Sequence, residues 1–324
     1  MNSSKAIGGY FSLELPSVSN PNPVIDGIYL NTARNALEYI LEAVKPSKVY
    51  MPLYICDVML EPFEKTNTKY EFYGVNEQLE MAKDIELKDN ELILYVNYFG
   101  IKSDYCHHLI DTFGDKVIID ASQAFYYRQH ASENILYSPR KFFGIPDGGV
   151  VVTKHAINRQ LPSDESLSKL SHLIKRHELE PEAGYGDFQV NDKKLEHQPI
   201  RTMAPFTLRL MQSIDYTAIQ KRRIENFTQL HTKLQHLNKL NFDQNNNDTP
   251  MVYPLLIENG DKLRDVLVKN RIFVATYWPN IFSWADEGDT EYGLAKNLLP
   301  LPIDQRYDGN DMERILEVIH EYIN

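Results

Sequence analysis

The chain has 324 residues, of which 43% are hydrophobic, enough for one large or two modest globular domains with a buried core. Its 34 basic and 45 acidic residues give a formal net charge of −11, which argues against a nucleic-acid backbone as the main partner. Only Cys56 and Cys106 are present, which excludes a disulfide framework and a cysteine-rich metal site. The N-terminus lacks the long apolar run of a signal peptide and no segment reaches the length of a membrane span, so we expect a soluble, cytoplasmic protein.

The first substantial helix is expected between Thr32, a suitable N-cap, and Pro46, which ends it. Apolar residues recur at helical spacing between these two positions. Free backbone N–H groups at a helix N-terminus favour an anion, so Thr32, Ala33 and Arg34 can cradle a phosphate. Arg34 can add a charge-assisted bidentate contact, although an ordinary capped helix with an exposed arginine is compatible with the same residues.

Strands and helices then alternate, with strands expected over residues 48–51, 70–75 and 91–96 and helices over residues 54–65 and 104–113. This order predicts an α/β fold with a mostly parallel sheet wrapped by helices, in which ligands bind at the carboxyl ends of the strands. His107 and His108 would point to different faces of their helix, and no other ligand set at metal spacing lies nearby, so no metal site is predicted.

The stretch from residue 117 to 153 places an acid and an amine at the ends of neighbouring buried strands. The apolar run before Asp120 is typical of a strand buried on both faces, and Asp147-Gly148-Gly149 leads into a second, β-branched strand. Lys141 lies between the two strands. Such a carboxylate and lysine are the two protein groups that pyridoxal phosphate requires, since the acid keeps the pyridine nitrogen protonated and the amine forms a Schiff base. Taken alone, Asp120 could instead cap a turn and Lys141 could be a solvated surface lysine.

Three short motifs in this stretch have the spacing of a known family. They are Asp120-x-x-Gln123, Ser138-x-x-Lys141 and Asp147-Gly148-Gly149. The pattern resembles the core of the fold-type I pyridoxal-phosphate enzymes known as the DegT/StrS sugar aminotransferases. The resemblance covers nearly the whole chain but is absent between residues 155 and 198. It implies a fold-type I transferase with a large cofactor-binding domain, residues 1–212, and a small C-terminal α/β domain, residues 213–324.

The resemblance also assigns roles to single residues. It implies that Asp120 pairs with the pyridine nitrogen of the cofactor, that Gln123 contacts the ring hydroxyl, and that Lys141 carries the cofactor. Ser138 would bind the cofactor phosphate.

Two positions depart from the family pattern. The family's Ser-Gly-Thr turn at the phosphate is here Thr32-Ala33-Arg34, which leaves a role for the backbone at Ala33 and Arg34. Tyr54 is the aromatic residue close to the position that stacks on the cofactor ring in the family. Cys56 aligns better with that position, and Tyr54 can also be a core residue.

The rest of the chain gives weaker patterns. A helix is expected over residues 167–174 and a loop over residues 181–186. A long helical region over residues 205–237 contains Lys221-Arg222-Arg223, which resembles the family's linking helix and equally suits a charged helix face. The small domain is expected to have strands over residues 251–257, 271–277 and 298–303 and helices over residues 260–269 and 310–323.

These features predict a pyridoxal-phosphate-dependent aminotransferase. The resemblance implies an amino-acid donor such as glutamate and a nucleotide-linked keto sugar as acceptor. Relatives that dehydrate sugars carry histidine in place of the lysine, so Lys141 argues against that chemistry. The alternative is a non-catalytic or regulatory protein that keeps the fold.

Charge and resemblance together predict a homodimer. A cofactor phosphate and an anionic sugar nucleotide must bind to a chain of net charge −11, so cations have to converge on the site. Arg34 is the large-domain cation near the matched motifs, whereas Arg201 and the cluster at residues 221–223 lie outside them. The resemblance implies that such residues reach the neighbouring chain's site across a two-fold interface.

Overall fold

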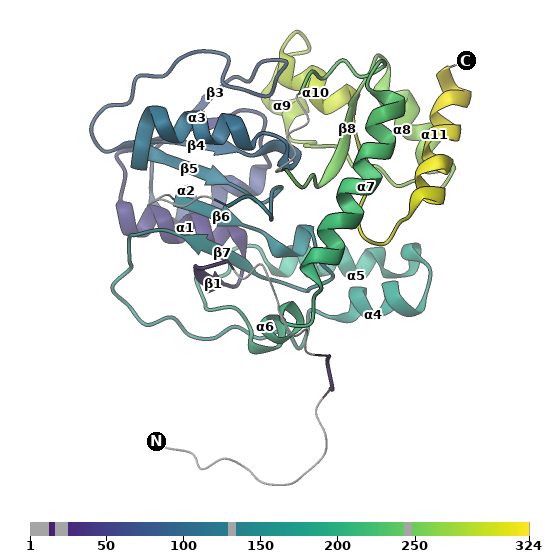
Figure 1. Cartoon of the computed structure of the whole chain (residues 1–324). Helices are drawn as coiled ribbons and strands as arrows, with labels where there is room; N and C mark the ends of the chain where they lie inside the picture. Colours follow the sequence, from purple (N-terminus) through teal and green to yellow (C-terminus); the bar gives the residue numbers. More distant parts are fainter. Residues whose placement is uncertain (1–12, 17–24, 129–133, 243–247, 324) are drawn as a thin grey trace.

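Seven strands form one sheet in the order β1-β7-β6-β5-β4-β2-β3 (Figure 1). The structure is a computed structural model that describes residues 13–16, 25–128, 134–242 and 248–323. Only β7 runs against its neighbours, and the other pairings are parallel. The strands are β1 (Ile28–Leu30), β2 (Lys48–Pro52), β3 (Tyr70–Tyr73), β4 (Glu91–Val96), β5 (Val117–Asp120), β6 (Asn134–Tyr137) and β7 (Gly149–Val152).

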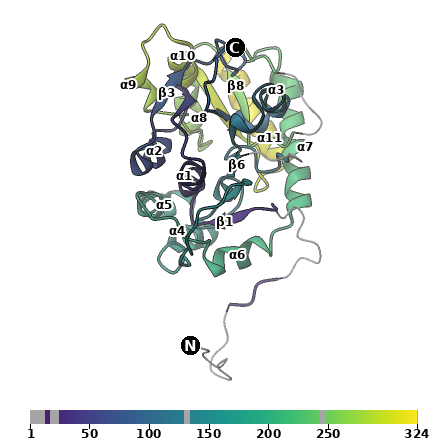
Figure 2. The same cartoon turned by 90° about the vertical axis from the view of Figure 1, so that its left-hand side faces the viewer.

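The centre of the sheet is buried on both faces. Every residue of β4, β5 and β6 is buried, as expected for parallel strands covered by helices on each side. Helices α1 (Ala33–Val44) and α2 (Glu61–Thr66) lie over one face, and α3 (Ser103–Phe113) lies over the other (Figure 2). Short 3-10 turns connect these elements: Asp57–Leu60, Tyr98–Gly100, Gly114–Lys116 and Pro139–Lys141.

Helix α1 begins and ends as the sequence predicts. The Thr32 hydroxyl accepts a hydrogen bond from the Asn35 backbone N–H at 3.0 Å, which satisfies one of the free donors of the first turn. At the other end Lys45 adopts the left-handed conformation just before Pro46. The apolar stripe of the helix packs into the core of the sheet, which fixes the position of its N-terminus.

A second layer lies beyond the carboxyl ends of the parallel strands, whose arrowheads point toward it (Figure 1). It contains the antiparallel pair β8 (Val252–Leu256) and β9 (Leu298–Pro302). Its helices are α7 (Tyr216–Leu234), α8 (Gly260–Lys269), α9 (Ile281–Trp284), α10 (Thr290–Asn297) and α11 (Gly309–Ile323). The predicted domain boundary after residue 212 falls in the turn before α7 and stays a prediction.

The strand predicted over residues 271–277 is wrong. Burial does alternate there, because Ile272 and Val274 are buried while Phe273 is half exposed, but this segment forms no ladder with any described strand. Arg271 enters the segment with a φ of 58°, in the left-handed region, which turns the backbone out of an extended path. The alternating pattern therefore reflects one buried side of an irregular segment.

The region without family resemblance, residues 155–198, forms helices α4 (Ser171–Glu178) and α5 (Pro181–Lys194), and α6 (Pro205–Met211) follows it. The loop predicted over residues 181–186 is wrong, because Pro181 occupies the first turn of α5, where its missing N–H has no cost. The single long helix predicted over residues 205–237 is instead α6 and α7. Asp215 starts α7 by accepting a hydrogen bond from the Ala218 backbone N–H at 2.9 Å.

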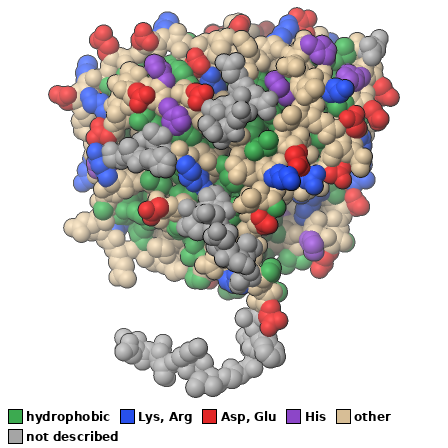
Figure 3. Space-filling model, in the orientation of Figure 1, with side chains coloured by type: hydrophobic (Ala, Val, Ile, Leu, Met, Phe, Trp, Pro, Cys, Tyr) green, Lys and Arg blue, Asp and Glu red, His purple; other side chains and the backbone are tan. Residues whose placement is uncertain are grey.

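Within the described part of the chain, no helix is long and apolar enough to cross a membrane. Acidic and basic side chains are interspersed over the face seen in Figure 3, so neither sign forms a broad patch there. Residues 1–12, on which the signal-peptide prediction depends, lie outside the described residues.

Candidate active site

Asp120 ends β5 and is 3% exposed. Its Oδ1 accepts a hydrogen bond of 2.8 Å from the Ser122 backbone N–H. Burial raises the pKa of the Asp120 carboxyl, while the positive charge of Lys141 and hydrogen bonds from Ser122 oppose the shift. The carboxylate is therefore desolvated, and the stabilising charge near it is that of Lys141.

Lys141 ends the 3-10 turn Pro139–Lys141, which follows β6, the strand next to β5. Its Nζ donates a hydrogen bond of 3.1 Å to the Ser122 hydroxyl. The side chain is exposed, unlike its neighbours at this edge. The structure thus brings Asp120 and Lys141 to the same end of two adjacent strands. The strand next to β5 is β6, which is not among the strands predicted from the sequence, and β6 separates β5 from β7.

Gln123 is 1% exposed and has only half of its amide satisfied. Its Oε1 accepts a hydrogen bond of 2.8 Å from the Phe99 backbone N–H, but its buried Nε2 has no hydrogen-bond partner among the described residues. A buried donor without an acceptor is costly, so such a group in a native protein calls for an explanation. An acceptor atom of a bound molecule would satisfy it.

The glycine pair after Asp147 brings β7 against the N-terminus of α1. A Cβ on Gly149 would lie 2.3 Å from the Thr32 carbonyl and 2.5 Å from the Ala33 nitrogen, so only glycine fits. Gly148 has a φ of 113° and donates its N–H to the Asn31 carbonyl at 2.8 Å. The first amides of α1 are thereby held beside the sheet edge that carries Lys141.

Arg34 is buried, with an exposed fraction of 7%, and its Nη1 lies 3.7 Å from the Glu61 carboxylate of α2. The interpretation of Arg34 as an exposed surface arginine is therefore wrong. Ala33 is half-buried, and Ser138 is 5% exposed just before the turn that carries Lys141. Ala33 lies against Gly149 at the start of β7, and Ser138 directly follows β6, so both residues lie at the end of the sheet that carries Lys141.

Tyr54 lies in an aromatic cluster of the core. It is 0% exposed, its ring stacks on Tyr98 at 5.7 Å, and it meets the edge of Trp278 at 5.0 Å. Cys56 lies close enough to Lys141 for the lysine charge to oppose the effect of burial, which raises the pKa of the Cys56 thiol to about 11. The thiol is thus protonated and unreactive as a nucleophile at neutral pH.

The second layer holds the backbone directly after Lys141, a contact that no local sequence pattern indicates. The Phe142 carbonyl accepts hydrogen bonds from Arg223 of α7 at 3.3 Å and from Gln305 at 2.8 Å. Arg223 is 1% exposed, and its guanidinium lies 4.6 Å from the centroid of the Phe142 ring. The expectation that Arg223 reaches a neighbouring chain is therefore wrong. Lys221 and Arg222 instead lie on the surface, near Glu225.

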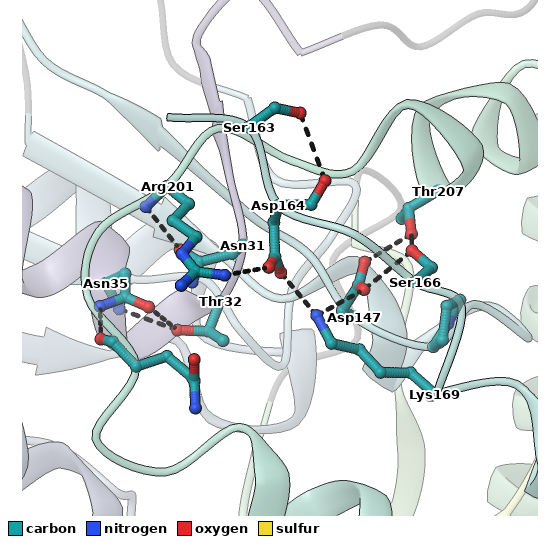
Figure 4. Close-up of polar contacts among 12 residues, drawn as sticks. Asn31, Thr32, Asn35, Asp147, Ser163, Asp164, Ser166, Lys169, Arg201 and Thr207 are labelled. Atoms are coloured by element: carbon teal, nitrogen blue, oxygen red, sulfur yellow. Dashed lines mark hydrogen bonds and ion pairs between the residues drawn. The ribbon is translucent and has the colours of Figure 1, made fainter. Parts of the chain in front are cut away.

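The Asp147 carboxylate is the centre of a buried network (Figure 4). It is 0% exposed and accepts hydrogen bonds from Ser166 at 3.0 Å, from Lys169 at 3.1 Å and from Thr207. Lys169 also contacts Asp164 at 2.5 Å, and Arg201 reaches the other oxygen of Asp164 at 3.2 Å. Arg201 thus has a partner in its own chain.

No family model and no curated protein matches the chain, whereas solved structures do. The sugar aminotransferase CalS13 from Micromonospora echinospora superposes with a TM-score of 0.59 and 12% identity, over 90% of this chain and 86% of its own. A DegT/DnrJ/EryC1/StrS aminotransferase from Brucella abortus superposes with a TM-score of 0.56 and 15% identity, over 91% of this chain and 85% of its own. NtdA from Bacillus subtilis, with bound cofactor PMP, superposes with a TM-score of 0.60 and 17% identity, over 91% of this chain and 72% of its own. The chain has the fold of these aminotransferases.

This likeness confirms the predicted fold class and, at the level of the fold, the family resemblance seen in the sequence. About nine-tenths of this chain is covered in each of the three superpositions. At these identities the roles of single residues depend on the local geometry of Asp120, Gln123 and Lys141. No group of three or more metal-binding side chains occurs among the described residues.

Proposed function

We propose that the protein is a pyridoxal-phosphate-dependent aminotransferase. The observation that carries the proposal is that three groups lie at or just beyond the ends of β5 and β6. They are the buried Asp120 carboxylate, the Lys141 amine, and the Gln123 Nε2, which has no hydrogen-bond partner among the described residues. An anion acceptor, an amine and a spare donor fit the pyridinium nitrogen, the aldehyde carbon and the ring hydroxyl of this cofactor. When bound, pyridoxal phosphate supplies a ring that accepts the electrons of the bond broken at the amino-bearing carbon.

Each of the three residues has a distinct task. The negative charge of Asp120 would keep a proton on the ring nitrogen; burial raises the pKa of this carboxyl, and a positive charge beside it opposes that rise and favours the carboxylate. Gln123 donates its free N–H to the ring hydroxyl. Lys141 Nζ holds the cofactor between turnovers and, once released, moves a proton to and from the substrate carbon.

The phosphate would be held by Ser138 and by the backbone N–H groups of Ala33 and Arg34. The first amides of a helix have no partner within the helix and favour an anion, and Gly149 lets them approach the sheet edge. Because the Arg34 guanidinium lies next to Glu61, the phosphate would be bound by the Arg34 backbone N–H rather than by the side chain.

The acceptor proposed is a nucleotide-linked keto sugar and the donor is glutamate. The support is the likeness to CalS13, a sugar aminotransferase, which covers most of both chains. We also propose a cytoplasmic homodimer. Two free cysteines suit a reducing compartment, and the net charge of −11 favours a site to which a second chain adds cations. Sedimentation equilibrium tests the dimer directly.

The test is to find where the cofactor is attached. Purified protein incubated with pyridoxal phosphate should absorb visible light, and borohydride reduction followed by peptide mapping should place the adduct on Lys141. Lys141→Ala should lose the adduct and reduce turnover by about a thousandfold or more, with the melting temperature kept. Lys154→Ala is the matched control, because Lys154 is an exposed lysine paired with Asp115. A protein that stays colourless would favour the non-catalytic alternative, and an adduct on another lysine would refute the assignment.

A further inference from the structure

Ser122 connects the two charged groups of the candidate site. Its backbone N–H donates to Asp120 Oδ1 at 2.8 Å, and its hydroxyl accepts a hydrogen bond from Lys141 Nζ at 3.1 Å. Among the described residues the contact of the Lys141 amine is with Ser122, and the lysine acts on Asp120 only through its charge. Ser122 is 5% exposed and lies in the tight turn that follows β5. Its position is therefore set by the backbone, whereas the lysine side chain is exposed.

Ser122 is the only hydrogen-bond acceptor that the described residues provide to the Lys141 amine. The Cys56 thiol, which also feels the charge of Lys141, donates instead to Asp57 Oδ1 at 3.6 Å. The Gln123 oxygen is already occupied by the Phe99 N–H. A lysine has four rotatable side-chain bonds, so an amine without a fixed acceptor samples many positions.

We propose that Ser122 is a positioning residue for Lys141, whose hydroxyl holds the free amine beside Asp120. The catalytic part of this inference rests on the proposed function. Each time the amine is released from the cofactor, the Ser122 hydroxyl keeps it near the place where it has to act. The hydrogen bond also holds the amine at this fixed position, so a reagent in solution meets it less freely than it meets a fully solvated lysine amine.

The first test uses the cofactor-free protein and therefore does not depend on the proposed chemistry. Trace labelling of amines with acetic anhydride, read by peptide mass spectrometry, gives the rate at Lys141 relative to Lys83, an exposed lysine. Ser122→Ala should raise this ratio by about threefold to tenfold, the effect of one lost charge-assisted hydrogen bond at a partly solvated group. Ser122→Thr, which keeps a hydroxyl, should restore the wild-type ratio.

Ser103→Ala is the matched control. Ser103 is also a buried serine, 8% exposed, and its hydroxyl accepts from Asn97 at 3.2 Å rather than from a lysine. Its loss should leave the Lys141 ratio unchanged. If the extra methyl group of Ser122→Thr prevents folding, Ser122→Gly replaces it as a second hydroxyl deletion and should match Ser122→Ala.

The second test uses the loaded enzyme. Ser122→Ala should lower kcat by about tenfold and leave the KM of the donor unchanged, because Ser122 touches the amine and not the substrate. An unchanged labelling ratio in Ser122→Ala, or an equal change in Ser103→Ala, overturns this inference. A wild-type protein that stays colourless with pyridoxal phosphate would instead overturn the proposed function and leave the labelling result standing.

Discussion

The carboxylates of Asp120 and Asp147 are both buried near one edge of the sheet, yet their surroundings differ. Asp120 accepts hydrogen bonds from Ser122 and has a lysine charge nearby. Asp147 has both oxygens occupied by side chains of Ser166, Lys169 and Thr207 (Figure 4). The chain itself thus provides hydrogen bonds to both oxygens of Asp147, whereas Asp120 can still accept a hydrogen bond from a ligand.

This difference separates a candidate ligand group from a structural one. A buried carboxylate is tolerated when hydrogen bonds and a counter-charge compensate for lost water, and Asp147 is compensated within its own chain. Asp120 is compensated in part, which suits a carboxylate that meets a cationic ligand atom. The same motif that contains Asp147 still serves the site, because its glycines bring β7 against α1.

The largest effect is expected for Asp120→Ala. Without the carboxylate, a bound cofactor would lose the group that keeps its ring nitrogen protonated. Turnover should fall by about a thousandfold or more, as for other removed electrostatic partners. Single-turnover measurements with glutamate would follow the change in cofactor absorbance directly.

Asp115→Ala is the control for this substitution, because Asp115 lies just before β5, is 56% exposed and pairs with Lys154. It should behave as wild type. Near wild-type single-turnover rates in Asp120→Ala would show that both buried aspartates are structural and would remove the distinction between them.

Asp147→Ala should act on stability instead of chemistry. The substitution leaves the buried Lys169 with one carboxylate where it had two, and leaves Ser166 and Thr207 with each other. We expect a loss of about 2 to 4 kcal/mol in the free energy of unfolding, typical of breaking a buried charged network. Urea midpoints measure the loss, and borohydride mapping of the folded protein should still place the adduct on Lys141.

Asp192→Ala is the surface control for Asp147→Ala, because it removes an exposed carboxylate instead of a buried one. The Asp192 side chain is 42% exposed and pairs with Arg140 at 2.8 Å, so its loss should hardly move the urea midpoint. If Asp147→Ala were as stable as wild type and lost the adduct, the Asp147 network would belong to the active site.

The sequence predicts those parts of the fold that depend on local pattern. Thr32 marks the start of α1, and the apolar runs of β4 and β5 identify the centre of the sheet. The motif spacing also predicts that Asp120 and Lys141 share one site, but β6, whose end carries the Lys141 turn, is not among the predicted strands.

Contacts between distant residues are what the sequence does not reveal. Thr207 lies 60 positions from Asp147, and Arg223 lies 81 positions from Phe142. Serine, threonine and arginine in a charged helix have no local signature of such burial. Pro181, where a loop is predicted, begins α5 instead; proline suits both a loop and the first turn of a helix, so its presence does not decide between them.

Asp248 is a third buried carboxylate to compare with Asp120 and Asp147. It lacks a full set of hydrogen-bond partners among the described residues and lies outside the candidate active site. It is 8% exposed, and its Oδ2 has no hydrogen-bond partner among the described residues. Burial raises the pKa of the Asp248 carboxyl from 3.8 to about 6; Asp104 adds to the shift, while hydrogen bonds from Ser103 and the charge of Lys102 oppose it. Because the folded-state pKa is raised, the folded protein binds a proton more tightly than the unfolded chain. The resulting stability is complete below about pH 4 and is lost as the pH rises through 6.

Asp248→Asn should therefore stabilise the protein where the carboxylate is charged. We expect a gain of about 1 to 2 kcal/mol at pH 8, less than the full pKa shift would give, because water still reaches part of the group. The gain in the urea midpoint should shrink at pH 4.5, where the wild-type carboxyl is mostly protonated in the folded protein. Asp111→Asn, at an exposed position of α3, should change the midpoint little at either pH. A loss of stability in Asp248→Asn at pH 8 would mean that the charged carboxylate has a partner, as Asp147 does, and that an unfilled oxygen is no guide to function in this fold.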